Sequence, residues 1–439
     1  MKEQFNVQPY LRVLEKKHAF TPKGVIKQAI GLTLEAKGPK VSLGELCYAK
    51  TNKPNKEMVP CEVVGFKDEK ILLMPLGDTE GIGPGSELFM TGRSLSVNVS
   101  VDLVGRVLNG LGELIDEDER INYQGLYPVM NMPPNPLSRS LITEVLPVGV
   151  KAIDGLLTIG KGQRLGIFAG SGVGKSTLMG MIARNTTADV NVIALIGERG
   201  REVREFLEKD LGEEGLKRSV VVVATSHQPA LVRLKGAFVA TSIAEFFRDQ
   251  GKDVLLLMDS LTRFALAQRE VGLAIGEPPA TRGYTPSVFA LLPKLLERAG
   301  TSDRGTITGL YTVLVEGDDL NEPVTDTVRG IVDGHIILSR KIAAQNLYPA
   351  IDVLPSISRV MAQIVDEEQA ENARHMRTIL ANYEDAKDLI DIGAYKSGAN
   401  AAIDEAIRLI NPTTDFIRQR VDEKVDFTSV LEGLRRVFN

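Results

Sequence analysis

A glycine-rich turn that ends in a lysine is the stretch of this chain best suited to chemistry. It reads "IFAGSGVGKST" over residues 167–177, with Ala169 where the strict phosphate-loop pattern has glycine. Glycines let successive backbone amides point at a phosphate chain, and the helix that follows adds the positive end of its dipole. Lys175 would contact the β- and γ-phosphates, the Ser176 hydroxyl would bind Mg²⁺, and Thr177 would reach the α-phosphate side. The predicted ATP-binding residues of this turn are Gly170, Ser171, Gly172, Val173, Gly174, Lys175, Ser176 and Thr177.

A site for Mg²⁺ and a nucleotide also needs carboxylates at the ends of neighbouring strands. The apolar run in "KDVLLLMDS" ends at Asp259. We expect this carboxylate to bind the metal together with Ser176. The run "VIALIGERGREV" places Glu198 just after another apolar strand, where a carboxylate would orient and polarise the attacking water. Taken alone, Asp259 also suits a helix cap, and Glu198 also suits a surface pair with a nearby arginine.

Negative charge that builds on the γ-phosphate calls for a mobile cation, which is worth roughly 10³–10⁵ in rate when an arginine supplies it. Spacing alone does not choose among the arginines, and each of them also suits a surface salt bridge. The candidates are Arg263, Arg282, Arg329, Arg340 and Arg359. An adenine ring needs an aromatic face, and Tyr348 in "QNLYPAIDVLPSISR" either supplies that face or packs in the core.

The elements that must position these residues follow a βαβ pattern. Between about residues 146 and 365, apolar runs such as "RLGIFA" and "RSVVVVATS" alternate with helix-like segments such as "GAFVATSIAEFFRDQG". This alternation predicts a mostly parallel sheet covered by helices, within an ATPase domain over residues 96–365. The Gly- and Pro-rich stretch 108–139 is expected to be loop and linker.

Different patterns flank this domain. Short alternating runs separated by Gly, Pro, Asn and Asp predict a β-barrel domain over residues 22–95. After residue 365 the strand signals end, and "EEQAENARHMRTILANYEDAKDLIDI", "NAAIDEAIRLI" and "TDFIRQRVDEKV" predict a helical domain over residues 366–439. Residues 1–21 carry apolar side chains among basic ones, and we expect them to bind a partner or a membrane surface.

Composition argues against several classes of protein. The net charge is −5 and the chain has no Trp, so neither attraction to a phosphate backbone nor a set of stacking aromatics favours nucleic acid as a partner. The two cysteines lack a CxxC pattern and are expected to be reduced thiols, as in a cytosolic protein. No apolar run reaches the ~18 residues of a membrane span, so none is expected.

Four stretches together resemble the α/β-subunit superfamily of rotary ATPases: "FAGSGVGKST", "GERGREVREF", "LLLMDSLTRFALAQREVGLAIGEPPATRGYTPSVFALLPKLLERAG" and "YPAIDVLPSISR". Within that superfamily, "GRVLNGLGELID" and "AIGEPPATRGYTPSVF" are similar to the flagellar type III protein export ATPases, from about residue 22 to the end of the chain. The resemblance implies an α/β fold: a RecA-like P-loop ATPase core, an N-terminal β-barrel and a C-terminal helical domain. It also implies Mg²⁺-dependent ATP hydrolysis that energises flagellar protein export.

Roles for individual residues follow from the same resemblance. Glu198 would activate water with support from Arg199, and Arg359 in "SISR" would reach into the site of the neighbouring subunit. The implied catalytic residues are Lys175, Glu198, Arg199 and Arg359, the metal-binding residues are Ser176 and Asp259, and Tyr348 would stack beside the adenine.

The resemblance further implies an assembly and its location. The chain would form a homo-oligomer, a ring of six copies, in the cytoplasm and peripherally associated with the inner face of the cell membrane. The implied partners are stator and stalk proteins, export substrates with their chaperones, and the membrane export gate.

Related functions stay open at the level of sequence. An injectisome type III secretion ATPase would share all of this chemistry, and only the stretch "AIGEPPATRGY" favours the flagellar branch. The catalytic subunit of a rotary proton-translocating ATP synthase also carries an arginine near the position of Arg359. In non-catalytic ring subunits the water-activating glutamate is replaced, so Glu198 argues against that class.

Overall fold

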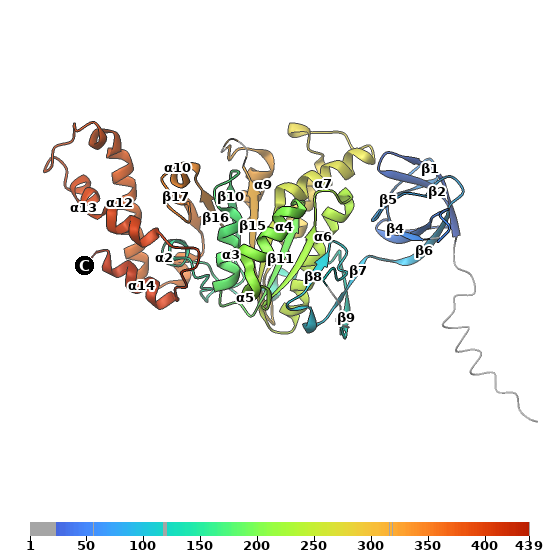
Figure 1. Ribbon diagram of the computed structural model, residues 1–439, viewed down its shortest axis with the longest axis horizontal. Coiled ribbons are helices and arrows are strands. Elements are labelled where there is room, and N and C mark those ends of the chain that lie inside the picture. The colour runs from blue at the N-terminus through green and yellow to red at the C-terminus, as the bar shows by residue number, and fades with distance from the viewer. Residues whose placement is uncertain (1–22, 56, 117–120, 316, 318, 439) are drawn as a thin grey trace, which may run out of the picture. The chain divides into compact units, whose positions relative to one another are not determined.

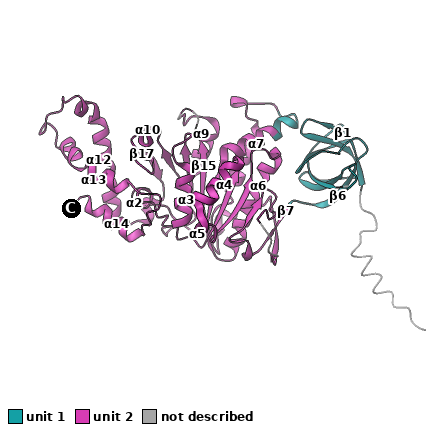
Figure 2. Cartoon of the chain, in the orientation of Figure 1, with its two compact units in different colours: residues 1–95, 271–277 teal, residues 96–270, 278–439 magenta. Residues whose placement is uncertain are grey.

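The computed structural model describes residues 23–55, 57–116, 121–315, 317 and 319–438. The predicted partner-binding segment 1–21 therefore lies outside the described residues. The chain divides into two compact units, residues 1–95 with 271–277 and residues 96–270 with 278–439, shown in two colours in Figure 2.

Unit 1 contains a closed six-stranded barrel. Its strands follow the order β1-β2-β5-β4-β3-β6, and all neighbours are antiparallel. Because successive side chains of a strand point to opposite faces, the alternating pattern in the sequence places about every second side chain in a small apolar core. Cys47 and Cys61 lie opposite each other in that core as free thiols, and burial raises the pKa of both to about 12. The strands are β1 (Lys23–Ile30), β2 (Thr33–Lys37), β3 (Glu45–Lys50), β4 (Met58–Lys67), β5 (Lys70–Pro75) and β6 (Glu87–Ser94).

Unit 2 is built on one large sheet whose strand order is β17-β16-β10-β15-β13-β11-β12-β8, with β14 paired to β15. All the pairs are parallel except β16 with β17 and β14 with β15. The strands are β8 (Val107–Asn109), β10 (Arg164–Ala169), β11 (Val190–Ile196), β12 (Ser219–Ala224), β13 (Asp253–Asp259), β14 (Gly300–Thr301), β15 (Thr306–Leu314), β16 (Gly334–Leu338) and β17 (Ile351–Ser358).

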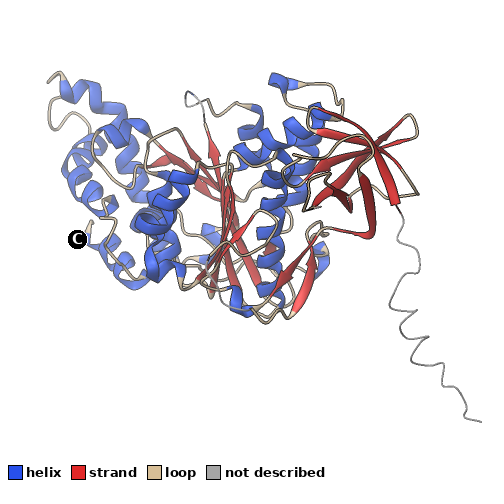
Figure 3. Cartoon of the chain, turned by 45° about the vertical axis from the view of Figure 1, so that its right-hand side comes forward, coloured by secondary structure: helices blue, strands red, loops and turns tan. Residues whose placement is uncertain are grey.

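Helices cover both faces of this sheet, as the view in Figure 3 shows. The central strands are nearly continuous apolar runs because they are buried from both sides; all seven residues of β11 are buried. The α-helices of the ATPase region are α2 (Lys151–Leu156), α3 (Lys175–Asn185), α4 (Gly200–Glu205), α5 (Gly212–Leu216), α6 (Ala230–Asp249), α7 (Leu261–Ala274), α8 (Pro286–Leu296), α9 (Pro323–Ile331), α10 (Arg340–Ala344) and α11 (Met361–Ile364). Shorter turns are η1 (Val101–Leu103), η2 (Pro136–Ser138), η3 (Phe206–Leu211, π-helical) and η4 (Thr281–Gly283).

The stretch 108–139, expected to be loop and linker, is mostly irregular but also carries short pieces of regular structure. β8 joins the edge of the main sheet by pairing with β12, and β9 (Gly125–Pro128) pairs with β7 (Ser96–Val99). The sequence did not predict these strands because a strand of three or four residues, such as β8 or β9, leaves no periodicity in the sequence. The pairing partner of β8 lies more than a hundred residues further along the chain.

A fully buried ion pair holds the loop after β9 to the helical layer. Arg298 donates to both carboxylate oxygens of Glu245 at 2.8 and 2.7 Å, and the two side chains are 0% and 1% exposed. The Arg298 guanidinium also donates to the Val129 carbonyl and the Ser242 hydroxyl. Every charge in the cluster is thus matched, which is what makes burial of such a pair tolerable.

The chain ends in a helical region formed by α12 (Glu367–Asp391), α13 (Ala401–Ile417) and α14 (Phe427–Arg436), at the red end of the ribbon in Figure 1. The run 414–425 was expected to be helical, but α13 ends at Ile417 and residues 418–426 are extended and irregular. None of the described helices has the length and apolar character needed to cross a membrane.

Candidate functional site

The glycine-rich turn lies between β10 and α3 and lines a cavity of about 550 Å³. Gly172 and Gly174 have φ angles of 79° and 86°, a region that side-chain-bearing residues rarely adopt, and Gly174 caps α3. Glycines in this conformation allow successive loop amides to point at one anion, at the positive end of α3. Of the predicted loop residues, all but Val173 line the cavity; Val173 is buried in the core beneath.

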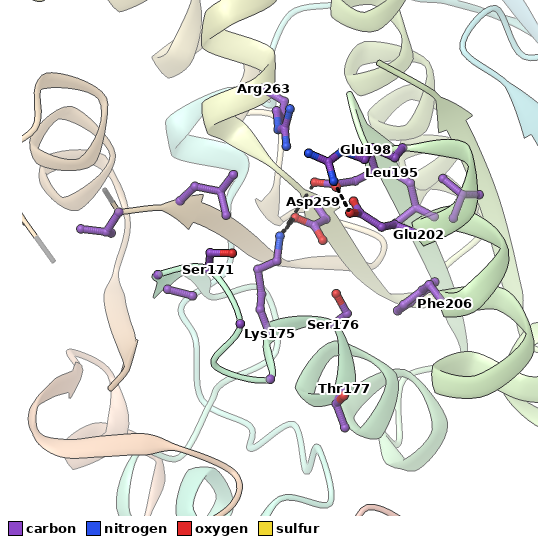
Figure 4. A pocket seen from close by; sticks show the side chains of 18 of the residues that line it. Ser171, Lys175, Ser176, Thr177, Leu195, Glu198, Glu202, Phe206, Asp259 and Arg263 are labelled. Carbon is purple, nitrogen blue, oxygen red and sulfur yellow. Dashed lines mark hydrogen bonds and ion pairs between the residues drawn. The ribbon is translucent and has the colours of Figure 1, made fainter. Parts of the chain in front are cut away.

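Lys175 and Asp259 meet at the centre of the cavity, as Figure 4 shows. The Lys175 ammonium forms an ion pair with Asp259 Oδ1, and the Thr312 hydroxyl donates to the same oxygen at 2.7 Å. Thr312 comes from β15, the strand beside β13, so two neighbouring strands fix the carboxylate. Sequence reasoning missed Thr312, although a threonine within the apolar run "GLYTVLV" was the signal that could have found it.

Glu198 approaches from the end of β11, because Leu195 is in register with Asp259 on β13. Its Oε1 lies 3.9 Å from the Lys175 ammonium and is buried without a hydrogen-bond partner among the described residues. Burial raises the pKa of Glu198 to about 7; the Asp259 charge adds to the rise and Lys175 opposes it. The neighbouring Glu202 carboxyl raises the pKa of Glu198 further; Glu202 lines the same cavity, and sequence reasoning did not single it out. The site therefore holds an acceptor suited to a water proton.

Two of the five candidate arginines line the cavity. Arg263, on α7, lies across from Glu198 in Figure 4, and its charge lowers the pKa of that carboxyl. The Arg340 guanidinium packs against Gly170 so closely that a methyl group there would lie 2.7 Å from its Nε. By contrast, Arg282 forms an ion pair with Asp319 at 3.2 Å. Arg199 is at the cavity rim, 72% exposed, and 3.6 Å from Glu202.

Arg359 lies near the amino-terminal ends of the parallel strands, whereas the phosphate loop of its own chain lies at their carboxyl-terminal ends. The loop follows Ala169, which is in register with Leu338 at the carboxyl end of β16. β17 runs antiparallel to β16, so Ser358 is in register with Gly334 at the amino end. Arg329 is at that end too, since its carbonyl accepts a long 3.5 Å bond from Arg359. Neither arginine is brought into the cavity of its own chain.

Tyr348 stands at the other end of the phosphate loop from Arg340. Its ring lies 3.7 Å from the position that a methyl group on Gly174 would take, and 39% of the residue is exposed. An aromatic face is therefore available next to the loop, where a base attached to bound phosphates would extend.

The donors in the cavity fit the chemistry of Mg²⁺. This ion prefers hard oxygen ligands and binds through a few protein groups together with substrate phosphates. The Ser176 hydroxyl and the Asp259 carboxylate are such donors, and both line the cavity beside the glycine loop. The Lys175 ammonium neutralises the charge of the Asp259 carboxylate.

Comparison with known proteins places the chain in a family. It is 55% identical to the flagellum-specific ATP synthase of Bacillus subtilis (strain 168), over 95% of both chains. The chain belongs to the ATP synthase alpha/beta family, among the type III export ATPases. This ATPase also matches the structure of the assembled ATPase EscN of the enteropathogenic E. coli type III secretion system, with 44% identity and a TM-score of 0.89 over 95% of this chain and all of EscN. A second structure, of EscN in complex with its central stalk EscO, matches at 43% identity with a TM-score of 0.88 over the same share of both chains.

Three regions of this ATPase match family descriptions. The beta-barrel domain of the ATP synthase alpha/beta family matches residues 26–92, and its nucleotide-binding domain matches residues 149–358. The C-terminal domain of the T3SS EscN ATPase matches residues 365–436. The predicted fold class is thereby confirmed; the predicted domain limits and the roles of individual residues stay predictions.

Proposed function

We propose that this chain hydrolyses Mg²⁺-bound ATP and thereby energises flagellar type III protein export. The observation that carries the proposal is that Lys175 forms ion pairs with Asp259 and Glu198 in the cavity lined by the glycine-rich loop, and all three side chains are largely buried. The family relationship supports the coupling to export. The match of residues 365–436 to an export ATPase domain favours this function over a rotary synthase subunit.

In the proposed reaction the chain's own groups position and stabilise charge. Loop amides and Lys175 hold the phosphates, while Glu198 accepts a hydrogen bond from the attacking water and orients it. Mg²⁺, held through Ser176 and Asp259, would neutralise charge on the β- and γ-phosphates. Thr312 keeps the Asp259 carboxylate in place. Arg199, at the rim of the cavity, would support Glu198 through its ion pair with Glu202.

The trans arginine and the base-binding residue complete the proposed site. Arg359 would act on the γ-phosphate bound by the next chain, since it lies away from the loop of its own chain. Tyr348 would stack on the adenine. A site that needs residues of two chains is active only in an assembly.

The proposed assembly is a ring of six identical chains with a stalk partner, supported by the assembled state and the stalk complex of EscN. We extend the proposal to a stator, to export substrates with chaperones and to the membrane gate as further partners. The ring would work in the cytoplasm, peripherally at the inner face of the cell membrane.

Two substitutions test the proposed chemistry. Lys175→Ala should abolish ATPase activity and weaken nucleotide binding, because the phosphates lose their cation. Glu198→Gln should bind nucleotide normally but lower kcat by about 100-fold or more. Steady-state hydrolysis and binding of a fluorescent ATP analogue measure the two effects. Exposed Glu208→Gln is the matched control. A Glu198→Gln chain that turns over at the wild-type rate would refute the assignment.

A further inference from the structure

A strap of chain, residues 418–426, connects α13 to α14 and crosses onto the ATPase core. Its Val421 carbonyl accepts a hydrogen bond from Arg184 of α3, the helix that starts at the phosphate loop, at 2.9 Å. Its Glu423 carboxylate is 2.5 Å from the Lys151 ammonium at the start of α2. The strap therefore belongs to the C-terminal region in sequence but is anchored to α3 and to the start of α2 in the ATPase region.

Gln419 is the buried centre of the strap, with 3% of its surface exposed. Its side-chain oxygen accepts from the Lys151 backbone amide at 2.8 Å. Its side-chain amide donates to the Gly149 carbonyl at 2.9 Å and to the Glu423 carbonyl at 3.0 Å. One side chain thus joins the strap to the segment before α2 and also fixes the strap's own turn. These bonds replace the helical ones that the sequence pattern led us to expect.

The backbone of the same residue holds the tyrosine beside the phosphate loop. The Gln419 amide donates to the Tyr348 carbonyl at 3.0 Å, and the Tyr348 ring faces Gly174. Tyr348 lies in the loop between α10 and β17, so the strap is a support for it from another part of the chain. A displaced Gln419 would release the carbonyl of Tyr348 and change where its ring stands.

We propose that Gln419 is a positioning residue for the nucleotide base: its side chain fixes the strap, and the strap fixes Tyr348. The C-terminal helices would thereby set the affinity for ATP without touching it. The inference rests on the proposed function, and specifically on Tyr348 contacting the base. It predicts that loss of the Gln419 side chain weakens the part of ATP binding that depends on the base and leaves the binding of the phosphates unchanged.

The test compares ATP with inorganic tripolyphosphate, which fits the phosphate loop but has no base. In Gln419→Leu, which keeps the side-chain volume and loses all three side-chain hydrogen bonds, KM for ATP should rise about tenfold with little change in kcat. The inhibition constant of tripolyphosphate against ATP hydrolysis should stay within about twofold of the wild-type value. A double variant with Tyr348→Ala should be no worse than Tyr348→Ala alone, because Gln419 acts through that residue.

Matched variants keep the result interpretable. Gln345→Leu makes the same chemical change at an exposed position three residues before Tyr348, and it should leave both constants unchanged. If Gln419→Leu does not fold, Gln419→Glu retains the acceptor for Lys151 and loses the two donated bonds, and it should show the same selective loss of ATP affinity.

Two outcomes overturn the inference: an unchanged KM for ATP, or an equal loss of affinity for ATP and tripolyphosphate. Neither would touch the proposed function, which fails instead if wild-type protein shows no ATP hydrolysis that depends on Lys175.

Discussion

Mixing two inactive variants should restore ATP hydrolysis if each site is shared between neighbouring chains. Arg359→Ala chains keep an intact phosphate loop, and Lys175→Ala chains keep an intact arginine. Each variant alone should lose most of its turnover; a trans arginine is worth roughly 10³–10⁵ in rate. The restored activity can come only from interfaces at which the first variant binds ATP and the second supplies Arg359.

The structure sets both the geometry and the size of this effect. On β16, Gly334 pairs with the residue before Arg359, and Leu338 pairs with the residue before the phosphate loop. The two are four residues apart, or about 13 Å along the strand. That is longer than an arginine side chain, so rescue within one chain is excluded. In a head-to-tail ring assembled from equal amounts of the two variants, about one interface in four pairs an intact loop with an intact arginine. The mixture should therefore reach about a quarter of wild-type activity.

The assay is steady-state phosphate release from rings purified through two different tags, one on each variant. Arg408→Ala, at an exposed position of α13, mixed with wild-type chains is the control for subunit exchange and should remain fully active. Doubly tagged rings without any recovery would refute a shared site, and so would full activity of Arg359→Ala on its own.

Further predictions concern the carboxylates and the core. Because the raised pKa of Glu198 is about 7, kcat/KM should fall as pH drops below about 7, where the protonated carboxyl no longer accepts a proton; a pH profile that stays flat down to the usual glutamate range would contradict this. Thr312→Val should lower kcat about tenfold by freeing the Asp259 carboxylate, with no change in melting temperature, and an unchanged kcat would contradict the positioning role. Arg298→Met should lower the free energy of unfolding by about 3–5 kcal/mol in urea titrations, since Glu245 is left buried and unpaired, whereas replacing both with Met should recover part of the loss.

The fold was predictable where burial dictates the sequence. Strands such as β11 and β13 are apolar along most of their length because both of their faces are covered, and this pattern can be recognised in the sequence without knowing which strands are their neighbours. β8 has no such pattern, since its place depends on pairing with a distant strand. The strap was misjudged because apolar residues at helical spacing are also compatible with an irregular segment. Here, buried hydrogen bonds of Gln419 outweigh the helical ones.

The candidate site divides in the same way. The glycine loop is local in sequence, and Asp259 and Glu198 come at strand ends that must converge at one edge of a parallel sheet. The sequence therefore predicted that both carboxylates lie at the same end of the sheet, and the pairing of β11 with β13 brings them close together. The support from Thr312 and the packing of Arg340 on Gly170 depend on side-chain placement across separate elements, which no spacing encodes.

The barrel of unit 1 has a consequence for crowding. Each of its six strands has a hydrogen-bonded neighbour on both sides, so the described part of the barrel has no open edge strand. Identical domains held at very high local concentration are otherwise at risk of exchanging strands or seeding fibrous aggregates. A closed barrel lowers that risk because it offers no edge strand for pairing. Any contact between the barrels of adjacent copies then depends on surface side chains, which single substitutions can change.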